Sequence, residues 1–371
     1  MTKRIAVWGI FDGYGGIERM IINFYKNIDK NKIQYDFLVP HNLGKMSFED
    51  EILEMGGRIF RILYSESESL IKARKCWKDY FKEHPEVIGV HIHANFPYAL
   101  PLVIAKQCKV PIRILHSHNS DQKNRSTRVI DKIRDIQVAR QIIKAPNIYF
   151  ACSDGAADYM FPGKQYTWIK NGIYLDKFMF NQDFRVMLRE QYDIKRNDIV
   201  IGQIGHLSDV KNSLFTVEVF YQLVKKQKNY KLVFIGGGPL ENRVRERVQE
   251  LNIEENVIFT GVIHETYQWY SAIDVLMMPS LYEGFPVVLI EAQTAGLPCV
   301  ISDTITKQVE VTDLIHYCRL DSQYTEWIEK IERLGNEPKE RQKYYEMVKD
   351  KGFDIGDCTR ELENIYLKYI N

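Results

Sequence analysis

Two glutamates give the clearest chemical signal in the sequence, because only seven residues separate them in the segment SLYEGFPVVLIEAQTAGLPCVISD. Glu291 interrupts an otherwise apolar helical pattern, and a lone carboxylate in such a helix is rarely buried without hydroxyl groups or cations around it. Glu283 stands beside Gly284 and Phe285 at the expected start of the same helix, where backbone N–H groups bind anions. We therefore expect both carboxylates to serve a ligand site. The alternative for Glu283 is a simple interaction with the helix dipole.

Lys211 is the candidate for neutralising a diphosphate. It follows the expected strand 199–205 in the segment GHLSDVKN, which also contains Gly205 and His206. A solvated surface lysine is the ordinary alternative. The glycine run at 236–238 again follows a strand and precedes a helix, but it lacks the Gly-Lys-Ser/Thr ending of a P-loop. This difference excludes a P-loop kinase or ATPase.

Glycines also follow the first expected strand. Gly15 and Gly16 would let a phosphate approach the backbone at a helix N-terminus. Glu18 replaces the third glycine of a dinucleotide fingerprint, so a nicotinamide or flavin site is a minor alternative. A tight turn with a positive φ would explain one of these glycines more easily than the whole cluster.

Four histidines stand as two pairs near strand ends, His91 with His93 and His116 with His118. The members of each pair are two residues apart, so they can point to one side of a sheet. Such pairs can bind a metal, but no cysteine or carboxylate beside them has ligand spacing, so we expect no metal site. We interpret His91 and His93 as polar residues at the exit of a buried strand. His116 is the better candidate for hydrogen bonding to a substrate or for proton transfer.

The elements that must position these residues follow a βαβ pattern, because short β-branched runs alternate with longer amphipathic ones. In the first half the expected strands are 4–8, 34–39, 58–63, 87–93, 111–116 and 148–153. The pattern slackens after residue 171 and then repeats. We predict an α/β fold of two doubly wound, Rossmann-like parallel-sheet domains, 1–170 and 171–350, which face a cleft. Whether the last segment, 353–371, packs back on the first domain is left open by the sequence.

Composition excludes several classes of protein. The 371 residues contain 50 Lys and Arg against 49 Asp and Glu. The resulting net charge of +1 provides no overall positive potential that would attract nucleic acid. The six cysteines lack the spacing of zinc or redox motifs, which suits reduced thiols in the cytoplasm. The first residues lack the apolar core of a secretory signal, so we expect a cytoplasmic protein.

Taken together, these features resemble glycosyltransferase family 4, whose members are retaining enzymes with the GT-B fold. The resemblance extends over almost the whole chain and is most specific in the pair Glu283 and Glu291. The other matching segments are Gly15-Gly16-x-Glu18, HSHN at 116–119, IKNGIYLDKF at 169–178, GHLSDVKN at 205–212, IGGGP and VIFTG. The chain looks most similar to bacterial exopolysaccharide and capsular polysaccharide glycosyltransferases.

The resemblance implies a role for each matching residue of the donor site. Glu291 would bind the ribose hydroxyls of a nucleotide. Glu283 would contact the donor sugar, together with the backbone of Gly284 and Phe285. The residues around the donor diphosphate would be Gly16, Gly205, His206 and Lys211. The family usually has arginine at the position of His206, and a histidine cannot form the bidentate phosphate contact of a guanidinium.

The resemblance also implies the catalytic residues. His116 would be the active-site histidine near the reacting sugar, and Lys211 and Glu283 would complete the catalytic set. The alternative catalytic or acceptor-binding residues are Glu18, His118 and Asn119. The sequence contains no Asp-x-Asp triplet, which metal-dependent glycosyltransferases generally use. We therefore expect no metal ion and no cofactor, with the nucleotide sugar acting as a substrate.

The implied reaction transfers a hexose from a nucleotide sugar, most simply a UDP sugar, to a polyprenyl-diphosphate-linked saccharide in exopolysaccharide or capsule biosynthesis. Such an acceptor would place the protein at the inner face of the plasma membrane. The basic stretches 72–78 and 125–140 could rest on anionic lipid there, or they could be ordinary solvated helix faces. The rival hypotheses are a nucleotide-sugar epimerase, a non-catalytic nucleotide-sugar-binding partner of a transferase and an NAD-dependent oxidoreductase.

Overall fold

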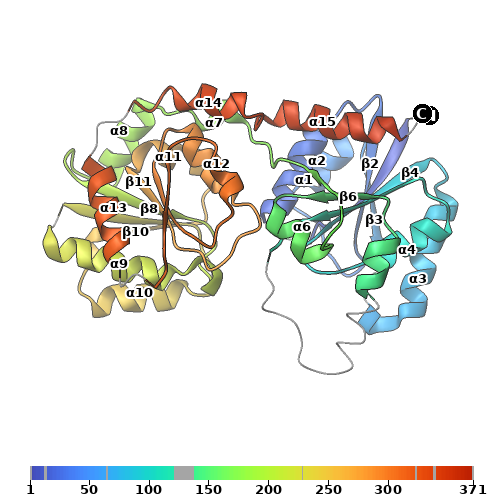
Figure 1. The fold of residues 1–371 in the computed structure, drawn as a ribbon, viewed down its shortest axis with the longest axis horizontal. Helices are drawn as coiled ribbons and strands as arrows, with labels where there is room; N and C mark the ends of the chain where they lie inside the picture. Colours follow the sequence, from blue (N-terminus) through green and yellow to red (C-terminus); the bar gives the residue numbers. More distant parts are fainter. Residues whose placement is uncertain are drawn as a thin grey trace. The chain divides into compact units, whose positions relative to one another are not determined.

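The computed structural model describes residues 2–11, 15–63, 66–120, 138–227, 229–321, 324–336 and 340–369. The chain divides into two compact units, Met1–Gly172 with Ile355–Asn371 (unit 1) and Ile173–Asp354 (unit 2). The sequence pattern predicts the corresponding boundaries after 170 and 350. Each unit has a wholly parallel sheet covered by helices, so the predicted α/β class with two Rossmann-like sheets is confirmed (Figure 1).

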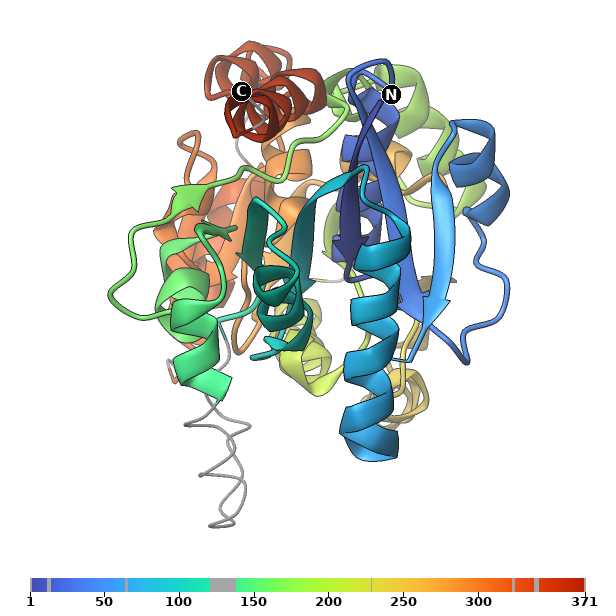
Figure 2. The same cartoon turned by 90° about the vertical axis from the view of Figure 1, so that its right-hand side faces the viewer.

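Unit 1 contains seven parallel strands in the order β3-β2-β1-β4-β5-β6-β7. The strands are β1 (Lys3–Trp8), β2 (Ile33–Pro40), β3 (Arg58–Ile62), β4 (Val87–Ala94), β5 (Ile112–Ser117), β6 (Ile148–Ala151) and β7 (Thr167–Trp168). The helices are α1 (Gly16–Asn27), α2 (Glu49–Glu54), α3 (Glu66–Glu83), α4 (Leu100–Gln107), α6 (Asp154–Met160) and α15 (Ile355–Lys368). Figure 2 shows the blue strands β1, β2 and β3 beside the teal strands that continue the sheet. The strand order reverses between β1 and β4, and α/β sheets bind ligands at such a switch point.

The last helix, α15, packs against α1 of unit 1 although the whole of unit 2 precedes it in the chain (Figure 1). Its Glu363 accepts hydrogen bonds from the backbone N–H of Asp29 at 3.0 Å and from Lys32 Nζ at 2.8 Å. On the same helix, Tyr366 is fully buried and its hydroxyl lies 3.2 Å from that of Tyr35. These contacts make α15 part of the core of unit 1.

Unit 2 contains six parallel strands in the order β10-β9-β8-β11-β12-β13. The strands are β8 (Ile199–Ile204), β9 (Tyr230–Ile235), β10 (Val257–Gly261), β11 (Val275–Met278), β12 (Cys299–Ser302) and β13 (Ile315–Cys318). The α-helices are α7 (Leu175–Phe178), α8 (Gln182–Gln191), α9 (Ser213–Lys226), α10 (Glu241–Glu250), α11 (Thr266–Ala272), α12 (Val287–Thr294), α13 (Thr325–Asn336) and α14 (Tyr344–Asp350). Here the strand order reverses between β8 and β11, which defines the switch point of this sheet.

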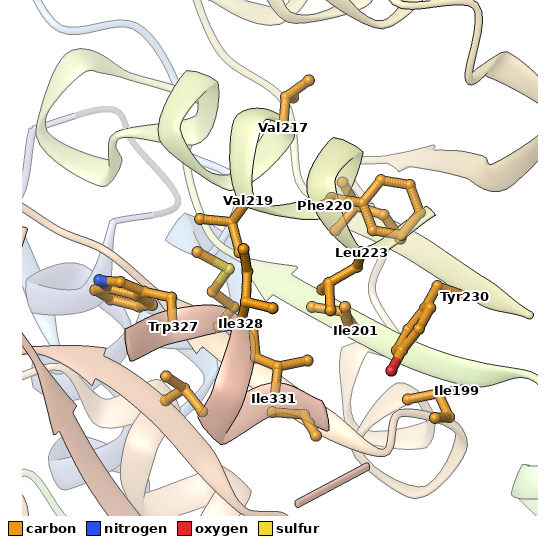
Figure 3. Close-up of a cluster of buried hydrophobic side chains, with 14 of the residues drawn as sticks. Ile199, Ile201, Val217, Val219, Phe220, Leu223, Tyr230, Trp327, Ile328 and Ile331 are labelled. Atoms are coloured by element: carbon orange, nitrogen blue, oxygen red, sulfur yellow. The ribbon is translucent and has the colours of Figure 1, made fainter. Parts of the chain in front are cut away.

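A hydrophobic core between α9, α13 and one face of the sheet holds unit 2 together (Figure 3). Phe220 and Leu223 of α9 stand three residues apart, and Trp327 and Ile331 of α13 stand four apart, so each helix presents one apolar face. Trp327 is fully buried, and its Nε1 donates a hydrogen bond to the carbonyl of Arg319 at 2.9 Å. This core fixes the position of β8 and α9, which flank Lys211.

One expected feature lies mainly outside the described residues. Most of the basic stretch 125–140 falls in 121–137. Within the described part of the chain, no helix combines the length and the apolar character that crossing a bilayer requires.

Candidate functional site

The carboxyl ends of β8 and β11 bring Gly205, Lys211 and Glu283 together. Gly205 directly follows β8, and Glu283 lies in the segment that follows β11. Lys211 ends the short 3-10 helix η1 (Asp209–Lys211), and its Nζ lies 2.6 Å from Glu283 Oε1. The two side chains are only 20% and 14% exposed, so the ion pair is partly shielded from water. This pair stands at the switch point, where ligands of α/β sheets bind.

Gly205 allows the backbone turn that precedes the lysine. Its φ of +137° lies in a region that side chains rarely adopt, and a Cβ there would come within 3.4 Å of Lys211 Cε. The amide of Gln203 donates to the Lys211 carbonyl at 2.9 Å and holds the end of η1 against β8. His206, the neighbour that the resemblance also assigns to the diphosphate, is exposed. The turn at Gly205 and the hydrogen bond from Gln203 therefore hold Lys211 in place on this loop.

The glycine run at 236–238 supports this loop. A Cβ on Gly236 would lie 2.2 Å from the Gly205 carbonyl, and a Cβ on Gly238 would lie 2.4 Å from the Leu207 carbonyl. The backbone N–H of Leu207 donates to the Gly237 carbonyl at 3.0 Å. Gly236 and Gly238 are thus needed because two backbone segments touch there.

Glu291 lies inside α12, as expected, and accepts a hydrogen bond from the fully buried Tyr270 of α11. Tyr270 is not predictable from the sequence, because nothing in the spacing of the chain links a tyrosine on one helix to a glutamate on the next. Its hydroxyl holds one carboxylate oxygen of Glu291 in place. A half-buried carboxylate with one anchored oxygen is suited to accept hydrogen bonds from paired hydroxyl groups.

The expected start of that helix is wrong. The helix α12 begins at Val287 with Pro286 as its N-cap, so Glu283 precedes the first turn instead of lying in it. Proline lacks an N–H and has a restricted φ, so it suits the start of a helix but not its interior. Phe285 is buried, and its ring stacks on Phe353 with centroids 5.9 Å apart. The segment around Gly284 is therefore anchored by an aromatic side chain.

Unit 1 has a pocket of about 440 Å³ at its own switch point. The described residues that line it are Trp8, Gly9, Phe11, Gly15, Gly16, Ile17, Glu18, His93, Ala94, Asn95, Phe96 and Tyr98. A Cβ on Gly16 would meet none of the described residues within 4 Å, so within that part of the chain nothing covers the N-terminus of α1 on this side. Glu18 is 9% exposed, accepts a hydrogen bond from the backbone N–H of Phe11 at 3.4 Å, and has its pKa raised by burial.

His116 does not reach this pocket. It is fully buried, and its Nε2 has no hydrogen-bond partner in the described part of the chain. Its Nδ1 lies 3.2 Å from His91 Nε2. His118, the alternative that the sequence left open, follows β5 and is 8% exposed. Asn119 donates from its side chain to the Asn95 carbonyl at 3.3 Å.

One ring nitrogen from each of His91, His93 and His116 lies within 4.8 Å of the other two, which is close enough for the three to ligate one metal ion. The rings of His91 and His93 are stacked, with centroids 4.0 Å apart and planes 24° apart. The in-plane lone pairs of stacked rings run side by side, whereas the ligands of a tetrahedral ion must converge on one point. The observed nitrogen contacts instead match hydrogen bonds between neutral imidazoles. The donor set does not fit a metal ion without rotation of these rings.

Two family models match the chain, "Glycosyl transferases group 1" over residues 185–351 and "Glycosyltransferase Family 4" over residues 14–177. EpsF of Bacillus subtilis, named as a glycosyltransferase, is 30% identical over 360 residues, which cover 95% of this chain and 93% of EpsF. An Escherichia coli α-1,3-galactosyltransferase is 26% identical over 249 residues, which cover 65% of this chain and 63% of that enzyme.

Solved structures show the same fold. Anabaena Alr3699/HepE in complex with UDP aligns with a TM-score of 0.80 at 13% identity, and the alignment covers 99% of this chain and 100% of HepE. The lipopolysaccharide glycosyltransferase WaaG aligns with a TM-score of 0.69 at 14% identity over 97% of this chain and 99% of WaaG. The chain therefore belongs to glycosyltransferase family 4 and has the GT-B fold.

Proposed function

We propose that this glycosyltransferase moves a hexose from a UDP sugar to a polyprenyl-diphosphate-linked saccharide, with retention of configuration, in exopolysaccharide or capsule biosynthesis. The observation that best supports a diphosphate-containing donor is the Lys211–Glu283 pair at the β8/β11 switch point. Alr3699/HepE, which has the same fold, has been solved with UDP-glucose. The galactosyltransferase relative is named for a diphosphoundecaprenol-linked acceptor.

In the proposed donor complex, Glu291 binds the ribose hydroxyls and Lys211 binds the diphosphate. Gly205 and His206 lie beside Lys211 on the same loop. Glu283 faces the donor sugar with the adjacent backbone of Gly284 and Phe285. An arriving diphosphate would share Lys211 with Glu283, so the pair keeps the lysine in position before the donor binds.

The proposed reaction breaks the bond between the anomeric carbon and the diphosphate oxygen. The acceptor oxygen bonds to the same face of that carbon, and the hydroxyl proton leaves with the diphosphate. Lys211 stabilises the negative charge that develops on the departing diphosphate. We further propose that no divalent metal is needed, because Lys211 would supply a positive charge to the diphosphate and the sequence has no Asp-x-Asp triplet.

UDP is expected to raise the thermal unfolding temperature of the protein. A ligand at a hundred times its dissociation constant adds about 2.7 kcal/mol to the stability of the folded state. Replacing Glu291 by Ala should abolish most of this stabilisation, since the ribose contact is lost. The shift should be the same in EDTA if no metal takes part. The measurement is differential scanning fluorimetry with UDP, GDP and NAD.

Two outcomes would contradict the proposal. Stabilisation by NAD alone would point to an oxidoreductase, and an unchanged UDP shift in Glu291→Ala would remove the ribose role. The matched control is Glu246→Ala, which removes an exposed glutamate from α10 of the same unit. Its UDP shift should equal that of the unchanged protein.

We also propose contact with an anionic membrane through α3. On this helix the side chains of Leu70 and Ile71 are 44% and 81% exposed. Lys72, Lys75 and Lys78 are exposed beside them. Apolar and basic side chains on one exposed helix face are typical of interfacial helices. The other basic stretch, 125–140, lies mainly outside the described residues.

Changing Lys72, Lys75 and Lys78 together to Gln should weaken binding to phosphatidylglycerol vesicles about a hundredfold. Each lysine near an anionic surface contributes about 1 kcal/mol, and about 1.4 kcal/mol corresponds to a factor of ten. Vesicle sedimentation measures this binding. Phosphatidylcholine vesicles and the Gln variants of Lys225 and Lys226 are the controls. Equal binding by both sets of variants would rule out α3 as the membrane contact.

A further inference from the structure

Four buried histidines meet at the carboxyl ends of β4 and β5 in unit 1, and the proposed donor site of unit 2 uses none of them. His93 lies directly opposite His116 in the parallel register of the two strands. The four rings form two hydrogen-bonded pairs. His91 Nε2 lies 3.2 Å from His116 Nδ1, and His93 Nδ1 lies 3.0 Å from His118 Nε2. We call His91 with His116 the inner pair and His93 with His118 the outer pair.

The inner pair is anchored in the core. His91 Nδ1 lies 2.6 Å from the hydroxyl of Tyr366 on α15, and that hydroxyl lies 3.2 Å from the hydroxyl of Tyr35 on β2. All of these side chains are at most 2% exposed. The cavity that His116 lines has a volume of only about 10 Å³, too small for a sugar. The inner pair therefore supports the fold and is closed to ligands.

One member of the outer pair, His93, lines the larger pocket of unit 1. His93 lines the 440 Å³ pocket and is 6% exposed, while its partner His118 is 8% exposed. Gly9, just after β1, lets β4 come this close, because a Cβ on Gly9 would lie 2.6 Å from His93 Cβ. Gly9 also has a φ of +135°, so no other residue would fit there without strain. The chain thus places His93 at the switch point between β1 and β4 by close backbone packing.

The chemistry of the pocket points to hydroxyl groups as its ligands. Burial lowers the pKa of His93 well below its usual value, so the ring is neutral at physiological pH and offers one donor or one acceptor nitrogen. Its Nδ1 is engaged by His118, which leaves Nε2 for a ligand. Among the described residues that line the pocket there is no lysine or arginine, and Glu18 contributes a carboxyl group. Such a surface is poorly suited to a phosphate.

The aromatic wall of the pocket adds an apolar contact. Trp8 and Tyr98 have ring centroids 6.1 Å apart, and Phe96 is 52% exposed beside them. Aromatic rings provide large apolar contact areas at low conformational cost. Rings next to a few hydrogen-bonding groups match a pyranose, which has an apolar face and hydroxyl groups around its edge.

We propose that His93 is a ligand-contacting residue of unit 1, that its imidazole forms a hydrogen bond with a hydroxyl group of the acceptor saccharide, and that His118 orients it. The saccharide as ligand rests on the proposed function. The placement of His93 at the pocket rests on geometry alone. In this arrangement His116 has no contact with substrate and positions β5 through His91.

Carbethoxylation with diethyl pyrocarbonate, followed by peptide mass spectrometry, tests the placement without any assay of activity. At pH 7 we expect His93 to react at least ten times faster than His91 and His116. The exposed His41 and His206 serve as fully reactive references. If His93 is as unreactive as His91 and His116, or if His116 reacts faster than His93, the proposal is wrong.

A kinetic experiment tests the ligand. With a short-chain prenyl-diphosphate saccharide as acceptor, His93→Phe should raise the acceptor KM about tenfold and leave the KM for the UDP sugar unchanged. The conservative variant His93→Gln should recover part of this loss, because its amide can replace one hydrogen bond. The control is His84→Gln, since His84 lies in the same unit before the start of β4.

The two proposals can fail separately. An unchanged acceptor KM in His93→Phe, measured while transfer proceeds, would overturn the role of His93 and leave the proposed function standing. If no UDP sugar is used and UDP does not stabilise the protein, the proposed function fails, and the contrast in carbethoxylation still decides whether His93 faces the pocket. Zinc that protects all four histidines from modification would show that the cluster is a metal site and would overturn the proposal.

Discussion

Acidification from pH 7 to pH 5.5 is expected to unfold unit 1 while unit 2 remains folded. Burial lowers the pKa of His118 to about 3, and it lowers those of His91, His93 and His116 well below their usual value. In the unfolded chain each of these histidines takes up a proton near pH 6.5. The unfolded state therefore binds more protons below that pH, so stability falls as the pH drops through 6.5 and is fully retained above it.

The expected effect is large because four histidines act together. Each neutral histidine loses about 1.4 kcal/mol of stability for every pH unit below its unfolded pKa, so the cluster loses about 5 kcal/mol by pH 5.5. That is comparable to the entire stability of a small domain, which is about 5–15 kcal/mol. In unit 2 none of the described histidines, His206, His264 and His316, is buried.

Hydrogen–deuterium exchange measured peptide by peptide at pH values between 7.5 and 5 separates the two units. Peptides from β4 and β5 should lose protection as the pH falls, while peptides from β8 and β11 should keep it. Replacing His118 by Gln should reduce the pH slope of unit 1 by about a quarter, since one of four proton-binding sites is removed. Protection in β4 and β5 that stays constant from pH 7.5 to 5.5 would contradict this prediction.

Replacing Lys211 by Met is expected to lower the transfer rate about 10²- to 10³-fold. This is the usual cost of removing one fixed group that stabilises charge developing in a transition state. The loss should fall mainly on kcat, because the diphosphate gains charge as it departs. Steady-state kinetics with the UDP sugar that the protein uses would measure it. The matched control is Lys226→Met, which removes an exposed lysine from the neighbouring helix α9.

A folding defect must be separated from this catalytic loss. Lys211→Met leaves Glu283 partly buried without its cation, which itself destabilises unit 2. The double variant Lys211→Met with Glu283→Gln removes both charges and should recover the thermal stability but not the activity. A transfer rate within twofold of the unchanged protein in the single variant would show that Lys211 does not stabilise the departing diphosphate.

The sequence determined the architecture of each unit, because strand and helix patterns depend on local spacing. The expected strands 4–8 and 87–93 correspond to β1 (Lys3–Trp8) and β4 (Val87–Ala94). The local pattern was less reliable at the start of α12. The helix begins after Pro286, so its first turn does not include Glu283. The carboxylate of Glu291 was also found from local pattern, since a charge inside an apolar helix is visible without any tertiary structure.

The tertiary structure alone decided which of these residues meet. Lys211 and Glu283 are separated by 72 residues, and His91 and Tyr366 by 275. Their contacts depend on the order of strands in each sheet and on the return of α15 to unit 1. Hydrophobic periodicity does not specify that order, because parallel strands buried on both faces have similar apolar patterns. For the same reason the sequence could place His93 and His116 at strand ends, but it could not show that His93 lines a pocket while His116 is enclosed in the core.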